Sequence, residues 1–160
     1  MKQDTEIKKA LAEFRLPTYE EIPDIGLYLD QVVKYINSYF VAFPEMNVTA
    51  SMLTNYVKLK LVKRINKKTY VREQIALFFF IAMAKTVISM DHIRILIKQN
   101  EKDSFETQYK EFTHILHEAL SSFQQKNTFP SQNEEQILAY IARAIAYKMY
   151  LERKLQTYQG

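Results

Sequence analysis

Glycine is nearly absent from this chain, and its scarcity limits the folds that the chain can adopt. Only Gly26 and Gly160 among 160 residues are glycine, and only four residues are proline. A fold of many β-strands needs tight turns at regular intervals, and these two residue types supply most of them. Hydrophobic residues make up 48% of the chain, so a packed core can form. The sequence therefore predicts an all-α protein.

Hydrophobic residues recur with a helical period along most of the chain. We expect helices at about residues 4–15, 25–40, 50–60, 72–86, 90–99, 103–124 and 134–157. The helix at 72–86 is apolar on nearly every side, which is typical of a helix at the centre of a core. The last helix is apolar on several faces between Ile137 and Leu151, which predicts either burial or a subunit interface. The polar stretch from Lys63 to Thr69 is too short for a helix and is expected to form a small hairpin or wing.

Capping residues support several of these boundaries. Asp24, Thr49 and Ser89 each precede an expected helix, where a side chain that accepts backbone N–H groups is favoured. Pairs of the capping-box type occur at Thr18 with Glu21 and at Ser131 with Glu134. The first pair lies in a proline-containing segment, 16–23, that we expect to form a tight turn or a one-turn helix.

Positive charge is concentrated in one window of the sequence. Between Met46 and Arg72 there is no Asp or Glu, and seven residues are Lys or Arg. They are Lys58, Lys60, Lys63, Arg64, Lys67, Lys68 and Arg72. The whole chain has 22 basic and 18 acidic residues, so the remainder, with 15 basic residues, is net negative. Because neutralised phosphates release counterions, such a window predicts a surface that faces a polyanion.

Missing residue types argue against several functions. The chain has no cysteine, so it can form no disulfide and no thiolate metal site. It also has no glycine-rich phosphate loop and no Gly-x-Ser-x-Gly motif. His114 and His117 lie one helical turn apart, but no third ligand accompanies them. We therefore expect no metal, no cofactor and no enzymatic activity.

The sequence also predicts where the protein resides. The longest uncharged apolar run, Ile75 to Ala84, has about half the length of a membrane span. The first six residues, Met-Lys-Gln-Asp-Thr-Glu, lack the apolar centre of a signal peptide. We expect a cytoplasmic protein with no membrane partner.

The segment from Val48 to Val62 resembles the recognition helix of MerR-type winged helix-turn-helix regulators. The matching places are Val48-Thr49 at the helix start, Leu53 and Tyr56 within it, and Lys60-Leu61 at its end. Further matches are Lys68-Thr-Tyr70 on the return strand of the wing, and Glu73-Gln-Ile75 and Ile88-Ser-Met-Asp-His-Ile93 at the starts of the next two helices. The segment 16–32 resembles an uncharacterised bacterial family, a domain of unknown function that carries this motif. Two departures are Thr54, where MerR regulators usually have Arg, and Lys60, where they have Gly.

The resemblance implies that the helix start enters the major groove of double-stranded DNA. Asn can pair with adenine, and Met can contact a thymine methyl group. The lysines and Arg64 would contact backbone phosphates, which position the protein without specifying a sequence. Tyr56 is expected in the core, with its hydroxyl reaching toward a phosphate. The residues assigned to DNA binding are Thr49, Ser51, Met52, Asn55, Tyr56, Lys58, Lys60, Lys63, Arg64, Lys67 and Lys68.

These observations predict three parts. They are an N-terminal arm and turn at 1–25, a MerR-like helix-turn-helix with a small wing at 26–99, and a C-terminal helical hairpin at 103–158. The first hypothesis is a DNA-binding transcriptional regulator that forms a homodimer through its C-terminal helices. The alternative is a protein-interaction or adaptor module on a helix-turn-helix scaffold that no longer binds DNA, as Thr54 and Lys60 suggest.

A small-molecule effector is compatible with the first hypothesis. Aromatic residues in the C-terminal part could line a pocket for it, namely Phe105, Tyr109, Phe112 and Tyr147. The competing interpretation is that these side chains only fill a core.

Overall fold

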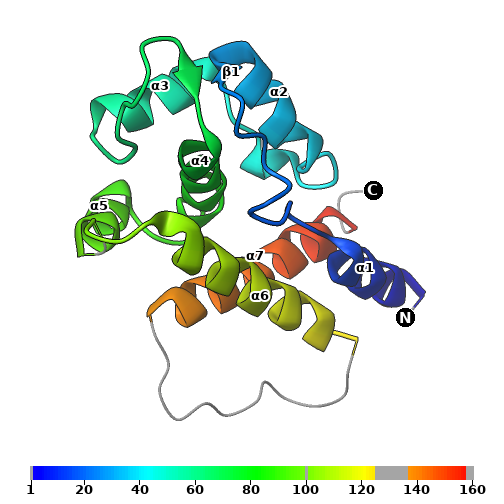
Figure 1. Cartoon of the computed structure of the whole chain (residues 1–160). Helices are drawn as coiled ribbons and strands as arrows, with labels where there is room; N and C mark the ends of the chain where they lie inside the picture. Colours follow the sequence, from blue (N-terminus) through cyan, green and yellow to red (C-terminus); the bar gives the residue numbers. More distant parts are fainter. Residues whose placement is uncertain (1, 100, 125–136, 158–160) are drawn as a thin grey trace. The chain divides into compact units, whose positions relative to one another are not determined.

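The structure, a computed structural model, describes residues 2–99, 101–124 and 137–157 and is mostly helical (Figure 1). The helices are α1 (Lys2–Glu13), α2 (Leu29–Ser38), a 3-10 turn (Pro44–Met46), α3 (Ala50–Lys58), α4 (Arg72–Ala84), α5 (Met90–Gln99), α6 (Phe105–Ser122) and α7 (Ile137–Gln156). In the described residues the strands are β1 (Leu27–Tyr28) and β2 (Thr69–Tyr70), which form one two-stranded sheet. The predicted all-α class is confirmed.

The chain divides into two compact units. One is continuous, residues 17–110; the other combines the two ends of the chain, up to Leu16 and from Glu111 onward. Helix α6 contributes residues to both units. The three parts expected from the sequence, 1–25, 26–99 and 103–158, were separated by their expected roles. That division stays a prediction.

Helix α4 forms the centre of the 17–110 unit, as its apolar sequence predicts. Nearly all of its residues from Gln74 to Ala84 are buried. The ring of Phe79 meets those of Tyr35, Tyr39 and Phe40 edge to face, with ring centres 5.6–6.0 Å apart. These contacts join α2 to α4 and fix the scaffold on which α3 is placed.

The short sheet shows that residues 63–69 do not form the small hairpin that the sequence predicted. Strand β2 pairs antiparallel with β1, which lies directly before α2, so that Leu27 is opposite Tyr70 and Tyr28 is opposite Thr69. The turn into β1 requires Gly26, which has a φ of +80°. A Cβ atom there would also lie 3.2 Å from the Thr69 hydroxyl oxygen. The segment 59–68 is therefore a loop between α3 and a strand that pairs with an earlier segment.

Most of the capping predictions that fall on described residues are confirmed, and one is wrong. Thr49 accepts a hydrogen bond from the Met52 amide at 3.2 Å, and Ser89 caps α5 through the amide of His92. Thr18 and Glu21 form the reciprocal pair, with distances of 3.1 and 3.2 Å. The Ser131–Glu134 pair lies outside the described residues.

Asp24 does not cap the helix that follows it. Helix α2 begins only at Leu29, because Gly26 and β1 intervene. The Asp24 carboxylate instead accepts a hydrogen bond from the amide of Arg72, 48 residues further along, at 3.1 Å. Asp24 is thus an N-terminal cap of α4, supplied by a distant segment.

Helix α3 ends in a Schellman motif centred on Lys60. The Leu61 amide donates to the Tyr56 carbonyl and the Lys60 amide to the Val57 carbonyl, both at 3.0 Å. Lys60 has a φ of 61°, the left-handed conformation that the resemblance implied for this position. Such a conformation costs a residue with a Cβ atom about 1–2 kcal/mol.

We expect Lys60→Gly to stabilise the protein by about 0.5–1 kcal/mol. Relief of the left-handed strain exceeds the added backbone entropy that glycine gives the unfolded chain. Urea unfolding would show a higher midpoint with an unchanged slope. Lys58→Gly, inside the helix, is the matched control and should destabilise by about 0.5–1 kcal/mol. An equal effect of both substitutions would contradict the assignment of strain to Lys60.

The unit formed by the two chain ends is organised around α1 and α7, which pack together. The Tyr150 hydroxyl donates to the Asp4 carboxylate, which also pairs with Lys8 at 3.0 Å and with Lys154 at 3.2 Å. The hydrogen bond from Tyr150 and the one from Lys8 hold the pKa of Asp4 well below its usual range. One carboxylate therefore links α1 to two turns of α7.

The aromatic residues of α6 fill cores. Tyr109 and Phe112 have no exposed surface, and Phe105 packs on Phe80 with ring centres 5.7 Å apart. The Tyr109 hydroxyl donates to the Pro17 carbonyl at 2.7 Å, which fastens the 16–23 turn to the start of α6. The core-filling interpretation therefore holds for Tyr109 and Phe112.

None of the helices in the described part of the chain combines the length and the apolar run that a membrane crossing requires.

Candidate nucleic-acid interface

The start of α3 presents a polar face to solvent. Thr49, Ser51 and Asn55 are exposed, Met52 is half-buried, and Lys58 is exposed in the last turn. The opposite face, with Leu53, is buried. The helix is therefore held by its apolar side, and its outward side offers two hydroxyls and one carboxamide at the amino-terminal end.

Tyr56 belongs to the core rather than to this face. Its side chain is only 3% exposed and its ring packs against that of Phe78, with centres 6.4 Å apart. Burial raises the pKa of the Tyr56 hydroxyl to about 12, so the group remains protonated. Tyr56 therefore lies in the core, as the sequence predicted, but its hydroxyl is buried and does not reach toward a phosphate.

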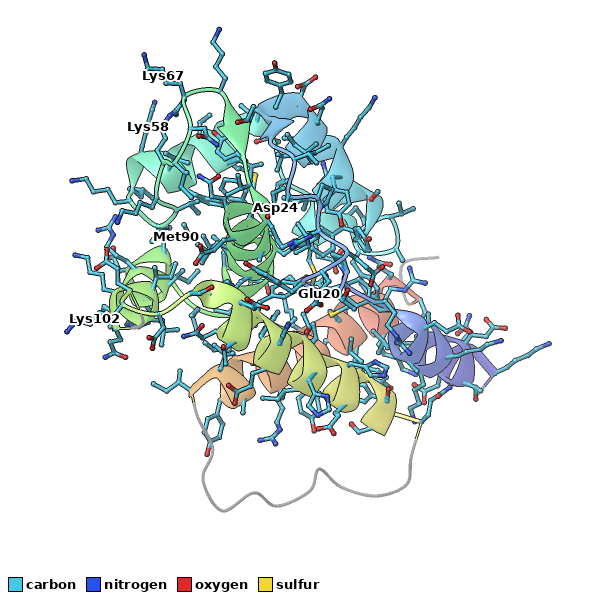
Figure 2. All side chains as sticks on the ribbon, in the orientation of Figure 1. Glu20, Asp24, Lys58, Lys67, Met90 and Lys102 are labelled. Carbon is cyan, nitrogen blue, oxygen red and sulfur yellow. The ribbon has the colours of Figure 1, made fainter. Side chains whose placement is uncertain are left out.

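The loop after α3 carries most of the positive charge. Lys60, Lys63, Arg64, Lys67 and Lys68 are all exposed. The Arg64 guanidinium donates to the Lys67 carbonyl, which closes the tip of the loop. Figure 2 shows Lys58 and Lys67 near one another, both extending outward from the same edge. We call these five residues together with Lys58 the basic surface.

The basic surface has no acidic neighbours to neutralise it. Within the described part of the chain, none of its six cations takes part in an ion pair. Lys110, by contrast, bridges Glu20 at 2.6 Å and Glu106 at 2.9 Å. The basic surface therefore keeps its full charge for an external anion.

Arg72, the seventh cation of the window, has a structural role. Its Nε donates to the Ile22 carbonyl at 2.8 Å and a terminal nitrogen to the Glu20 carbonyl at 3.0 Å. The guanidinium also lies over the ring of Tyr19, 5.6 Å from its centre. These contacts direct Arg72 into the 16–23 turn and away from solvent, so it is not part of the basic surface.

Gln74 positions the start of the loop, a role that the sequence analysis did not assign. Its side chain is 2% exposed. The amide oxygen accepts from the Val71 backbone N–H at 2.8 Å, and the amide nitrogen donates to the Lys63 carbonyl at 2.8 Å. The first bond caps α4 and the second fastens the loop to that cap. The signal in the sequence was a Gln at the third position of α4, the position from which a capping-box side chain reaches back to the residue before the helix.

Lys85 adds a cation beneath α3 that the sequence also did not reveal. Its amine lies 3.8 Å from the sulfur of Met52, 33 residues earlier in the chain. The side chain is half-buried, and burial lowers the pKa of the amine. Only the fold brings this residue, at the end of α4, to the start of α3.

His114 and His117 have different surroundings. The His114 ring pairs with Glu118 at 3.3 Å, whereas His117 is half-buried with no hydrogen-bond partner for its Nδ1. Burial lowers the pKa of His117, and nearby Arg15 and His114 lower it further. Across residues 2–99, 101–124 and 137–157, no cluster of three potential metal ligands occurs.

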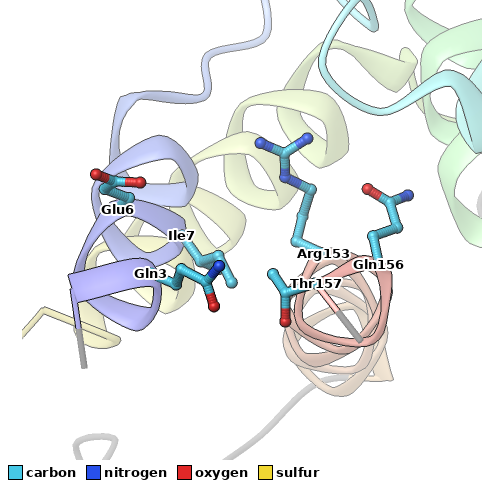
Figure 3. Close-up of a pocket in the computed structure, with 6 residues that line it drawn as sticks. All are labelled: Gln3, Glu6, Ile7, Arg153, Gln156 and Thr157. Carbon is cyan, nitrogen blue, oxygen red and sulfur yellow. The ribbon is translucent and has the colours of Figure 1, made fainter. Parts of the chain in front are cut away.

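A cleft of about 320 Å³ lies between α1 and α7 (Figure 3), and neither the two histidines nor the basic surface lines it. It is lined by Gln3, Glu6, Ile7, Arg153, Gln156 and Thr157. One carboxylate, one guanidinium and two amides face it, and the lining includes no aromatic ring and no strong nucleophile. The cleft therefore differs in chemistry from the aromatic pocket that the sequence suggested.

Comparisons with known proteins give one match. The sequence model of a family described as "Domain of unknown function (DUF1836)" matches residues 17–123. No curated protein and no solved structure matches the chain. The matched range contains the 17–110 unit, the basic surface and the remainder of α6.

Proposed function

This chain belongs to the DUF1836 family, a domain of unknown function, and we propose that it is a DNA-binding transcriptional regulator of the MerR-like winged helix-turn-helix type. The observation that carries the proposal is the basic surface. Six exposed cations without ion pairs lie on and directly after a helix whose amino-terminal face is polar and exposed. Neutral and cationic ligands would not require such a concentration of positive charge.

Helix α3 supplies the elements of base recognition. An α-helix fits the major groove of B-DNA, and residues at its amino-terminal end reach the base edges. Asn55 can form two hydrogen bonds with adenine, and Thr49 and Ser51 can bond to phosphates or bases. Met52, half-buried, can contact a thymine methyl group with its exposed part. In this proposal α3 specifies the sequence.

The loop supplies affinity. Its five cations are positioned to contact phosphates on either side of the groove that α3 occupies. Gln74 and the Arg64 contact restrain the loop before DNA arrives, so less ordering entropy is lost on binding. The order of the elements supports the MerR-like interpretation: two helices, a left-handed residue after the second, a basic loop and a short strand.

The proposal includes a homodimer in the cytoplasm, with double-stranded DNA as partner and no catalytic activity. With six phosphate contacts per dimer, the logarithm of the affinity should fall with the logarithm of salt concentration with a slope of about −5. Fluorescence anisotropy with duplex DNA at several salt concentrations measures this slope. A flat salt dependence would remove the proposal.

Selection from random oligonucleotides separates a regulator from a non-specific binder. A regulator should enrich one short motif, whereas contacts to phosphates alone enrich none. Enrichment of a motif would also provide the operator sequence for all further binding measurements.

One observation favours the alternative, an adaptor that has lost DNA binding. The Thr54 hydroxyl, at the position where MerR regulators usually have Arg, donates to carbonyls of its own helix, to Ala50 at 3.1 Å and to Ser51 at 3.0 Å. It therefore offers no donor to a phosphate. Purification with a stoichiometric protein partner and without nucleic acid would support the adaptor.

A further inference from the structure

We infer that the exposed face of α7 forms a symmetric, antiparallel homodimer contact with Ala144 on the two-fold axis. This inference deepens the proposed function by identifying its dimer surface. Helix α7 buries one side within its own unit, including Ile145 and Met149. On the other side several large apolar residues remain exposed. We call this exposed set the α7 stripe, and it consists of Ile137, Tyr140, Ala144, Tyr147 and Leu151.

The spacing of the α7 stripe is that of a helix-packing seam. Its members follow one another at intervals of three, four, three and four residues, which keeps them on one side of a helix. The large members are 58% (Ile137), 58% (Tyr140), 46% (Tyr147) and 52% (Leu151) exposed. An edge-to-face contact between Tyr147 and Phe123, with ring centres 5.4 Å apart, holds one member in place. Four half-exposed large residues in one row are typical of an interaction surface rather than of chance exposure.

The order of residues in the stripe indicates that the partner is a second copy of this chain. Read from either end, the α7 stripe has the same order of side chains: an aliphatic residue, Tyr, Ala, Tyr and an aliphatic residue. When two copies are placed antiparallel with the axis at Ala144, Ile137 is level with Leu151 of the second copy, and Tyr140 lies within one residue, about 1.5 Å, of the level of Tyr147. Ala144 faces its own equivalent, where a small side chain lets the helices approach. A two-fold symmetric interface requires this kind of self-complementarity.

Charge favours the antiparallel over the parallel arrangement. The second half of α7 carries Lys148, Arg153 and Lys154; Glu152 pairs with Lys148 at 2.9 Å, and Asp4 of α1 pairs with Lys154 at 3.2 Å. A parallel pair would bring both basic ends together and align the two helix dipoles. An antiparallel pair separates the basic ends along the interface.

The area of the stripe predicts a reversible dimer. A large apolar or aromatic residue presents about 200 Å², so four that are half exposed offer roughly 400 Å² per copy and roughly 800 Å² for the pair. Flanking side chains bring the total near about 1,000 Å², the lower limit for a specific interface. We therefore expect a dimer whose population depends on protein concentration.

Cysteine cross-linking of the full-length protein tests the geometry. The natural chain has no cysteine, so each introduced thiol is the only one. Under mild oxidation, Ala144→Cys should form a disulfide-linked dimer, because its two copies face each other. Equimolar Ile137→Cys and Leu151→Cys should form the mixed dimer in preference to either homodimer. Efficient homodimers of Ile137→Cys would overturn the antiparallel arrangement, and no cross-link at any of the three positions would overturn the interface.

Sedimentation equilibrium provides a second readout that needs no oxidation. Ala144→Glu places two carboxylates on the axis and should raise the dimer dissociation constant at least about ten-fold. Ala144 is exposed, so the helix content measured by circular dichroism should not change. Gln156→Glu, also exposed on α7, is the control and should leave the constant unchanged. An unaltered constant for Ala144→Glu would contradict the inference.

These measurements use protein without DNA, so the two proposals can fail separately. A cross-linked dimer that does not bind DNA would contradict the regulator alone. A DNA-binding protein that stays monomeric would contradict the α7 interface alone.

Discussion

Replacing Lys58 and Lys67 together by alanine is expected to reduce the affinity for duplex DNA about a thousand-fold at 0.1 M salt. Each phosphate contact contributes about 0.9 to the slope of log affinity against log salt. Six contacts per dimer correspond to three of the six cations of the basic surface in each chain. With Lys58 and Lys67 as two of these three, their loss removes four of six contacts per dimer, so the slope should change from about −5 to about −2. The lines of log affinity against log salt for the two proteins are expected to meet near 1 M salt. At 0.1 M salt, the two affinities should therefore differ by more than three powers of ten.

Lys98→Ala with Lys102→Ala is the matched control. Both residues are exposed, and the double substitution changes the net charge by the same amount. Figure 2 shows Lys102 well apart from Lys58 and Lys67. The control should change the affinity several-fold at most and leave the slope near its original value. Equal losses for the two double variants would mean that overall charge, and not the basic surface, governs binding.

Gln74→Leu is expected to lower the free energy of unfolding by about 2–3 kcal/mol. The substitution leaves the Val71 amide and the Lys63 carbonyl without their partner, and an unsatisfied buried group costs about 1–3 kcal/mol. Urea unfolding measures this loss. DNA affinity should fall as well, although all six cations are retained, because the loop loses its attachment to α4.

Gln31→Leu is the control that distinguishes attachment of the loop to α4 from ordinary helix capping. Gln31 occupies the same third position in α2 and accepts from the Tyr28 amide at 2.9 Å, but its side chain is exposed. Water can replace its single bond, so we expect a loss of about 1 kcal/mol at most and no change in DNA affinity. If Gln74→Leu behaved like Gln31→Leu, the attachment of the loop through Gln74 would be refuted.

Local patterns in the sequence predicted the helices and several of their caps. The apolar run around Phe79 indicated a central helix, and Thr49 indicated the start of α3. The left-handed residue at Lys60 was expected from the resemblance and is present. These features depend on neighbours a few residues apart, which sequence periodicity and capping rules describe well.

Features that depend on distant contacts could not be predicted. Asp24 caps a helix 48 residues away, and the strand after the basic loop pairs with residues near Gly26. Arg72 was counted among the surface cations because charge alone does not show that two carbonyls accept its hydrogen bonds. Tyr56 was correctly predicted to lie in the core, but its position within α3 did not show that its hydroxyl is buried as well. Of the candidate site, the exposed lysines and the polar helix start were foreseen, whereas Gln74 and Lys85 were not.

The contact between Asp4 and Tyr150 joins residues 146 positions apart, and this separation has a consequence for protein synthesis. Helix α1 leaves the ribosome well before α7, which packs on it. Residues 17–110 emerge in between and contain their own buried core. Ile7 and Leu11 of α1 must therefore be kept out of wrong associations until α7 has been made, and chaperones that bind short apolar segments would act in that interval.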